Sequence, residues 1–473
     1  MNQKITISVF NWGAFGQLAV VAAVLLSTGC AFYLPDRIHY TAYEDEAGND
    51  LSAAPFNVMP VADVPATSAS LPQFDDTTII GVALSGGGSR ASVFGAAALE
   101  VLAETGIAER ATYLSSVSGG GFPAAYYALK KPVPCQSSNT QEPCSSESFA
   151  QFKAAMRHNF LTGMTLNQIA KPGRITSSTR RLSSLQEELD DQFVEEAVFA
   201  DLPASPVLLI NGARYDDGRR FVFSNVAIPE EQSNVQQFSN ATLRTASFSM
   251  PGCARPAPPD FSVALALAIS AGFPPLLGPA TFEVPRTCAG GEPQYWHLGD
   301  GGILDNTGVE TIEDFALRAE TGGVKPERVV VFSVDAGRST PAATMMELRN
   351  LQLWTTDPGR VVDIVGKRAR AYRAVALEAL RKNSDVEFTL IEMAYTDAVI
   401  EKWPDECGNR KGGANAINQQ LENIPTSLKI TDCDAALLEV AARDVVGKAL
   451  TTHRDELVQL GIMFEPIEAP LTN

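Results

Sequence analysis

Three short glycine-rich segments carry residue types that together could perform acyl transfer. In the second of them, Ser118 lies within Ser116-Val117-Ser118-Gly119-Gly120, at a predicted strand-to-helix turn. Such a turn lifts a serine hydroxyl clear of the sheet and points the following backbone N–H groups at a developing oxyanion. Ser118 is therefore predicted to be a nucleophile, with an idle loop of the same composition as the alternative.

The first segment, Gly86-Gly87-Gly88, follows a predicted buried strand and precedes a predicted helix. Successive glycine amides in that position can bind an anion. A plain tight turn is one alternative, and a phosphate cradle lacks its Gly-x-x-x-x-Gly-Lys-Ser/Thr pattern. The dinucleotide fingerprint is met only in its looser form, which ends at Ala91. With Ser118 in the next unit, an oxyanion hole is the favoured interpretation, in which each donor stabilises the transition state by about 3–4 kcal/mol.

A serine hydroxyl needs a base, and the third segment offers Asp300 within Gly299-Asp300-Gly301-Gly302. Its flanking glycines let the carboxylate approach another loop, although an ordinary Asp-Gly turn has the same composition. The chain has 4 histidines, two of which lie in unpromising places: His39 in a predicted tether and His158 on an amphipathic helix. The other two are His297 and His453.

The elements that must position these segments have the pattern of an α/β fold. Residues 77–84 form a nearly continuous apolar, β-branched run, which is typical of a strand buried on both faces of a parallel sheet. A helix is expected over 91–104, a second strand over 113–117, and another helix that ends at Leu129. Two strand–turn–helix units in succession indicate a parallel sheet covered by helices.

The rest of the chain is predicted from shorter patterns. Residues 135–203 have mostly helical spacing, and the strands 207–211 and 220–223 flank the hairpin turn Asp216-Asp217-Gly218. The run 329–334 is the last core strand that we expect. Further helices are predicted over residues 360–382 and 435–460.

In this order, the glycine run, the Ser-x-Ser-Gly-Gly turn and the Asp-Gly-Gly turn resemble the patatin-like phospholipases. The strand pair 211–223 and the stretch Ser270-Ala271-Gly272-Phe273-Pro274-Pro275 add to the likeness, which covers residues 77–335 well and the C-terminal helices loosely. The resemblance implies a three-layer α/β fold with a mainly parallel central sheet flanked by helices. This hydrolase domain would span 76–465, with a helical insertion near 135–203 and a helical C-terminal part near 340–465.

The same resemblance implies hydrolysis of lipid acyl esters by a Ser–Asp dyad, without histidine, metal or cofactor. Ser118 would attack the ester carbonyl, Asp300 would accept its proton, and the amides of the glycine run (Gly86, Gly87 and Gly88) would hold the oxyanion. Arg90 would brace this loop. An ordinary aspartate is a weak base for serine, so a dry surround is expected, which the apolar stretch 263–277 could supply. Ser116 and Ala91 stand where the family usually has glycine.

Two other functions fit parts of the pattern. An α/β-hydrolase would use a triad of Ser118, Asp300 or Asp335, and His453, an order of residues that is allowed. Its glycine run usually begins with histidine, however, where this chain has Ser85. The second alternative is a non-catalytic envelope lipoprotein that keeps the fold for binding or scaffolding.

The N-terminus predicts export to a bacterial cell envelope. Lys4 is followed by the apolar run 18–26, which suits a signal peptide over residues 1–29. The sequence Ser27-Thr28-Gly29-Cys30 resembles a lipobox, so Cys30 is predicted to carry lipid and anchor a periplasm-facing protein at the membrane, with residues 30–75 as a tether. Plain secretion is the alternative, because the usual leucine lies one position too early, at Leu26.

The cysteines agree with export, and the net charge argues against one class of partner. The chain has 7 cysteines, and the six besides Cys30 are expected to form disulfides between sequence neighbours, with buried free thiols as the alternative. No Cys/His cluster indicates a metal site. A net charge of −18 argues against a nucleic-acid partner. The basic segment 360–373 could contact anionic lipid or be a solvated helix face. The three disulfides expected between sequence neighbours would join Cys135 with Cys144, Cys253 with Cys288, and Cys407 with Cys433.

Overall fold

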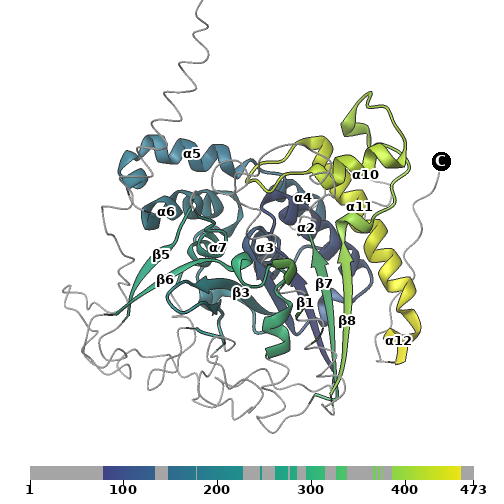
Figure 1. The fold of residues 1–473 in the computed structure, drawn as a ribbon, viewed down its shortest axis with the longest axis horizontal. Helices are drawn as coiled ribbons and strands as arrows, with labels where there is room; N and C mark the ends of the chain where they lie inside the picture. Colours follow the sequence, from purple (N-terminus) through teal and green to yellow (C-terminus); the bar gives the residue numbers. More distant parts are fainter. Residues whose placement is uncertain are drawn as a thin grey trace, which may run out of the picture.

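A mixed central sheet organises the computed structural model (Figure 1). Its 8 strands in the described residues have the order β5-β6-β3-β2-β1-β7-β8, with β4 paired to β3. The ladders that join β3, β2, β1, β7 and β8 are parallel, and the ladders of β3 with β4 and β6, and of β6 with β5, are antiparallel. The strands are β1 (Thr78–Leu84), β2 (Tyr113–Val117), β3 (Val207–Arg214), β4 (Arg219–Phe223), β5 (Ala280–Val284), β6 (Gln294–Asp300), β7 (Arg328–Asp335) and β8 (Glu387–Ala394).

The structure describes most of the chain between residues 78 and 459. Among these residues, no helix has both the length and the apolar character that crossing a membrane requires. The same residues contain no group of three or more metal-ligating side chains placed to hold an ion. The described ranges are 78–133, 148–176, 178–226, 245–247, 261–274, 277–284, 294–314, 326–337, 366–368, 371–372, 375 and 386–459.

The central strands bury both faces, and alternate residues enter two separate cores. In β1, Val82 and Leu84 join the larger core, while Ile79 and Ala83 join the smaller one on the other face. Helices α2 (Ser89–Glu104), α3 (Gly121–Lys130) and α11 (Asp432–Thr452) contribute to the larger core, and the helical segment 309–314 contributes to the smaller. The predicted three-layer α/β fold is thus confirmed, with a sheet that is mixed.

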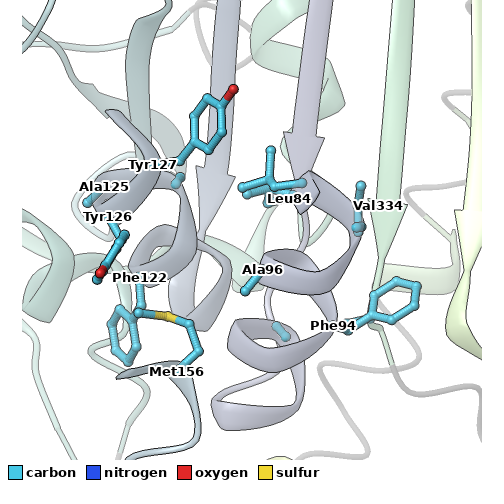
Figure 2. Packing of buried hydrophobic residues seen from close by; sticks show 14 of the residues in the cluster. Leu84, Phe94, Ala96, Phe122, Ala125, Tyr126, Tyr127, Met156 and Val334 are labelled. Atoms are coloured by element: carbon cyan, nitrogen blue, oxygen red, sulfur yellow. The ribbon is translucent and has the colours of Figure 1, made fainter. Parts of the chain in front are cut away.

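Aromatic and small residues fill the space between the sheet and the helices of the larger core. Figure 2 shows Leu84 at the end of β1 with Phe94 and Ala96 of α2 nearby, and Phe122 of α3 beside Met156. The Phe122 ring also lies 5.1 Å from that of Phe160. The remaining longer helices are α4 (Phe149–Met156), α5 (Phe160–Ala170), α6 (Ser178–Leu189), α7 (Val263–Ser270), α10 (Ala414–Asn423) and α12 (Arg454–Gln459).

The strongly patterned elements were predicted correctly, and the weakly patterned strands were not. The strands expected at 77–84, 113–117 and 329–334 and the hairpin 207–223 are present, as are the helices that follow the first two strands. The expectation that 329–334 is the last core strand is wrong, because β8 extends the sheet beyond it. β8 is an edge strand that exposes Glu387 and Glu392, and these charges interrupt the apolar run by which a buried strand is recognised in a sequence.

Cys407 and Cys433 form a disulfide, as expected for the third sequential pair.

Several other predictions concern residues outside the described ranges. The signal peptide, the tether and most of the basic segment 360–373 lie outside the described residues. So do the remaining cysteines, which are Cys30, Cys135, Cys144, Cys253 and Cys288.

Candidate active site

Ser118 occupies the turn at the end of β2, in a backbone conformation that residues other than glycine rarely adopt. Its φ is 51°, and the short 3-10 helix η5 (Ser118–Gly120) leads from it into α3. The Ser118 Oγ donates a hydrogen bond of 2.9 Å to Oδ2 of Asp300. Ser116, which replaces the usual glycine, is fully buried and directs its hydroxyl toward the Leu209 carbonyl of β3. The tight turn therefore forms with serine at that position.

Asp300 ends β6 and is almost completely buried, with 4% of its surface exposed. The strand β3 lies between β2 and β6, so it brings together two side chains that are 182 positions apart in the chain. Burial raises the pKa of Asp300 to about 6, and hydrogen bonds from the Gly302 amide and the Ser118 hydroxyl partly oppose this. The Gly302 amide donates to Oδ1 at 2.7 Å, which leaves Oδ2 for Ser118.

The glycine run after β1 lies directly against the serine turn. A Cβ added to Gly119 would be 2.2 Å from the carbonyl oxygen of Gly88, so the two loops touch through backbone alone. The Gly86 amide donates to the Asn306 carbonyl at 2.9 Å and is therefore occupied. In the described part of the chain, the amides of Gly87 and Gly88 have no acceptor, so these two are the donors that the loop has available.

Arg90 fixes this glycine loop to two other parts of the molecule. Its side chain is 1% exposed, and its guanidinium lies 5.4 Å from the ring centre of Tyr395. Nε donates to the Ala336 carbonyl at 2.9 Å, Nη1 to the Ile424 carbonyl at 2.7 Å, and Nη2 to Thr426 Oγ1 at 3.1 Å. The arginine thus links the start of α2 to the end of β7 and to the segment between α10 and α11.

The histidines that the structure describes are bonded to carboxylates other than Asp300. His158 Nε2 lies 2.6 Å from Glu188, His297 Nδ1 lies 2.6 Å from Asp216, and His453 Nδ1 lies 2.9 Å from Glu456. No histidine among the described residues is hydrogen-bonded to Ser118 or Asp300. Asp335 ends β7 and accepts from the Gly337 amide. Within the described ranges, the components of a Ser–Asp–His triad are therefore not assembled around Ser118.

Sequence reasoning missed three residues that contact the site. The Ser270 hydroxyl oxygen accepts a hydrogen bond of 2.9 Å from the backbone N–H of Ser118. The same hydroxyl donates a hydrogen bond of 2.5 Å to the backbone carbonyl oxygen of Asn211. Asn306 accepts the Gly86 amide through its own carbonyl. A signal existed for two of them, because Ser270 and Asn211 each begin a stretch noted for its likeness to the family. Their contacts depend on β3 and α7 meeting, which no local pattern predicts.

Comparison with known proteins identifies the domain that contains this site. Residues 82–312 match the family described as patatin-like phospholipase, so this part of the chain is a patatin-like phospholipase domain. No curated protein matches the chain.

Among solved structures, the human GIVD cytosolic phospholipase A2 is similar with a TM-score of 0.48 and 12% identity, covering 83% of this chain and 63% of that one. Its complex with methyl gamma-linolenyl fluorophosphonate inhibitor and terbium chloride gives a TM-score of 0.44 and 13% identity, with coverages of 83% and 60%. VipD from Legionella pneumophila gives 0.29 and 13%, with coverages of 80% and 67%. The chain thus spans less than two thirds of the length of the human phospholipase chains.

Proposed function

From the patatin-like phospholipase domain that residues 82–312 form, we propose that the protein hydrolyses acyl esters of lipids through a Ser118–Asp300 dyad. The observation that carries this proposal is the 2.9 Å hydrogen bond from the Ser118 hydroxyl to the Asp300 carboxylate. This carboxylate is buried, and its pKa is raised to about 6, so it is a stronger base than an ordinary aspartate. The proposed nucleophile and base are thus in hydrogen-bond contact, and no histidine among the described residues is bonded to either.

In the acylation step, Asp300 Oδ2 takes the hydroxyl proton of Ser118 as Oγ attacks the carbonyl carbon of the ester. The carbonyl oxygen becomes an oxyanion, which the amides of Gly87 and Gly88 are available to bind. Collapse of this intermediate breaks the bond to the alcohol, and the departing oxygen takes the proton back from Asp300. The products of this half-reaction are the free alcohol and a fatty acyl ester on Ser118.

Deacylation repeats the same proton transfers with water as the nucleophile. Asp300 accepts a proton from water, and the resulting hydroxide attacks the acyl carbonyl on Ser118. A second oxyanion forms and collapses, Asp300 returns the proton to Ser118 Oγ, and the fatty acid leaves. Because Asp300 must be ionised to start either step, activity is expected to rise as the pH increases through about 6.

The test is fatty-acid release from a panel of phospholipid, lysophospholipid, triacylglycerol and short-chain esters. We expect Ser118→Ala to lower kcat by a factor on the order of 10⁴ or more. Ser184→Ala is the matched control, since Ser184 is a buried serine whose hydroxyl has no partner among the described residues. Normal hydrolysis by Ser118→Ala would overturn the proposal.

The two alternatives predict different results in the same assay. His453→Ala should retain wild-type activity, because His453 is bonded to Glu456 and not to the dyad. Loss of activity in this variant would favour a Ser–Asp–His triad. Failure of the wild-type protein to hydrolyse any ester of the panel would favour a non-catalytic envelope protein.

We also propose that the protein is lipid-anchored at a bacterial envelope membrane through Cys30 and faces the periplasm. The support is the apolar run 18–26 and the Ser27-Thr28-Gly29-Cys30 sequence that follows it. Mass spectrometry of the mature N-terminus tests this, since a lipidated Cys30 as the first residue is expected. A mature chain that starts elsewhere and carries no lipid would contradict it.

A further inference from the structure

A buried serine outside the dyad holds the backbone of the nucleophile. Ser270 is the last residue of α7 and is fully buried. Its Oγ accepts the backbone N–H of Ser118 at 2.9 Å and donates to the carbonyl oxygen of Asn211 at 2.5 Å. An amide can only donate and a carbonyl can only accept, so these two partners fix the direction of the Ser270 hydroxyl hydrogen.

The conformation of Ser118 explains why such a contact is needed. At a φ of 51° the residue lies in the left-handed region, which costs a non-glycine residue about 1–2 kcal/mol. A conformation of this kind persists only where the surroundings hold it. Ser270 provides such a contact at the amide of the strained residue itself, one bond away from the Cα that carries the nucleophilic side chain.

Asn211 connects this contact to both members of the dyad. Its side-chain Nδ2 donates at 2.9 Å to Ser115 Oγ and at 2.9 Å to the Ser116 carbonyl, in the strand that leads to Ser118. Its backbone carbonyl, which accepts from Ser270, also lies against the turn after Asp300, because a Cβ on Gly301 would be 2.4 Å from that oxygen. The backbone of the nucleophile and the turn of the base therefore share one anchor.

We propose that Ser270, held by Asn211, is a positioning residue that sets the distance and direction between Ser118 Oγ and Asp300 Oδ2. This inference rests on the proposed function. Ser270 acts through the backbone of Ser118 and takes no part in the proton transfers. Because Ser270 occupies the Ser118 amide, this amide is not available to an oxyanion, whereas the amides of Gly87 and Gly88 have no acceptor among the described residues.

Substitution of Ser270 should lower the rate of the chemical step and leave substrate binding unchanged. We expect Ser270→Ala to reduce kcat by about 10- to 100-fold with little change in KM, because small displacements of a reacting group have effects of this size. Ser270→Thr, which restores a hydroxyl, should recover most of the lost kcat. Ser270→Cys has nearly the same volume but a weak donor and acceptor, so it should behave like Ser270→Ala and carries the test if the alanine variant does not fold.

The control variants distinguish a positioning role of Ser270 from a nonspecific disruption of the folded structure. Ser184→Ala, which removes the hydroxyl of a buried serine of α6, should keep the wild-type kcat. The midpoint of the pH–rate profile near 6 should be unchanged in Ser270→Thr and Ser270→Cys, because Ser270 makes no hydrogen bond to Asp300. A shifted midpoint, a raised KM with unchanged kcat, or an equal loss in Ser184→Ala would overturn the positioning role.

The same experiment distinguishes failure of this inference from failure of the proposed function. Activity that survives Ser118→Ala would overturn both proposals. If Ser118→Ala is inactive while Ser270→Ala and Ser270→Cys retain the wild-type kcat, the dyad stands and the positioning role is wrong. The expected pattern is an inactive Ser118→Ala, two slow Ser270 variants and a rescued Ser270→Thr.

Discussion

The turns that follow β1 and β2 have the same topology but use their backbone amides differently. Both connect the carboxyl end of a buried parallel strand to a helix, and both are rich in glycine. After β1, the amides of Gly87 and Gly88 have no acceptor among the described residues. After β2, the amide of Ser118 is bonded to Ser270. One turn thus keeps donors available, and the other uses its first donor to hold a strained residue.

The supports of the two turns differ in the same way. Arg90 reaches from the first helical turn of α2 to distant carbonyls, and so holds the glycine loop without using the amides of Gly87 and Gly88. Ser270 contacts the second turn at the amide itself. The difference teaches that a loop proposed to bind an anion must be fixed through atoms other than the particular N–H groups that bind it, since Gly86 and Ser89 still anchor the loop through theirs. A loop meant to aim a side chain can be fixed through its N–H.

The largest effect is expected from removal of Asp300, the proposed base, which accepts the hydroxyl hydrogen bond of Ser118 in the second turn. Asp300→Asn keeps the acceptor for the Gly302 amide but cannot take the Ser118 proton, so kcat should fall by a factor on the order of 10⁴. Steady-state kinetics on a soluble ester measures this. Asp335→Asn, at the end of strand β7, is the control and should be fully active. Equal losses in both variants would show that Asp300 is not the specific base.

The next effect comes from the first turn. Gly88→Ala places a Cβ 2.3 Å from the Ser427 carbonyl at a φ of 61°, so the loop must shift and its amides lose their aim. A loss of about 10²–10³ in kcat is expected, which is the usual result of removing an oxyanion donor. Gly106→Ala has a similar φ of 74° with nothing within 4 Å of the added Cβ, and should leave kcat unchanged. If Gly88→Ala were as active as Gly106→Ala, the glycine loop would not bind the oxyanion.

Burial of the Asp300 carboxylate should also affect the stability of the protein. Asp300 binds its proton more tightly in the folded state, so the wild type loses stability, relative to Asp300→Asn, as the pH rises from the unfolded value of 3.8 through about 6. A shift of this size corresponds to about 3 kcal/mol in the free energy of unfolding. Urea titrations of both proteins at pH values below and above this window measure the difference. A constant difference at all pH values would mean that the pKa of Asp300 is not raised.

The smallest effect concerns the support of the first turn. Arg90→Lys keeps the charge but cannot reach all three oxygen acceptors of the guanidinium, so the free energy of unfolding should fall by about 2 kcal/mol. Arg443→Lys is the matched control, because Arg443 forms a partly exposed ion pair with Glu104, and it should cost less than about 1 kcal/mol. Equal costs for the two variants would show that Arg90 does not brace the loop.

The parts of the fold that were predictable have strong local patterns. β1 is a continuous apolar run and β2 ends at a Ser-Gly-Gly turn, so both follow from a few neighbouring residues. β8 mixes exposed glutamates with buried residues because it lies at an edge. β5 alternates apolar and polar residues over only 5 positions, and β6 lacks a strong alternation. β6 pairs with β3 and β8 pairs with β7, and in both cases the partner strand lies far away along the chain, outside any local window.

The candidate site shows the same division. Ser118, Asp300 and the glycine run could be chosen by residue type and flanking glycines, because their chemistry is local. That Gly86 donates to Asn306, and that Ser270 accepts from Ser118, could not be predicted, since each bond joins segments more than a hundred positions apart. The sequence therefore indicates which groups can react, and tertiary structure decides which amides are free to assist them.

The most direct test of the account is the pH dependence with which an alkyl fluorophosphonate modifies the protein. Peptide mapping should find one adduct, on Ser118, which forms at a rate that rises through a pH of about 6 as Asp300 ionises. His453→Ala should react at the same rate, and Asp300→Asn should react slowly at every pH. An adduct on another residue, or loss of the reaction in His453→Ala, would contradict a Ser118–Asp300 dyad.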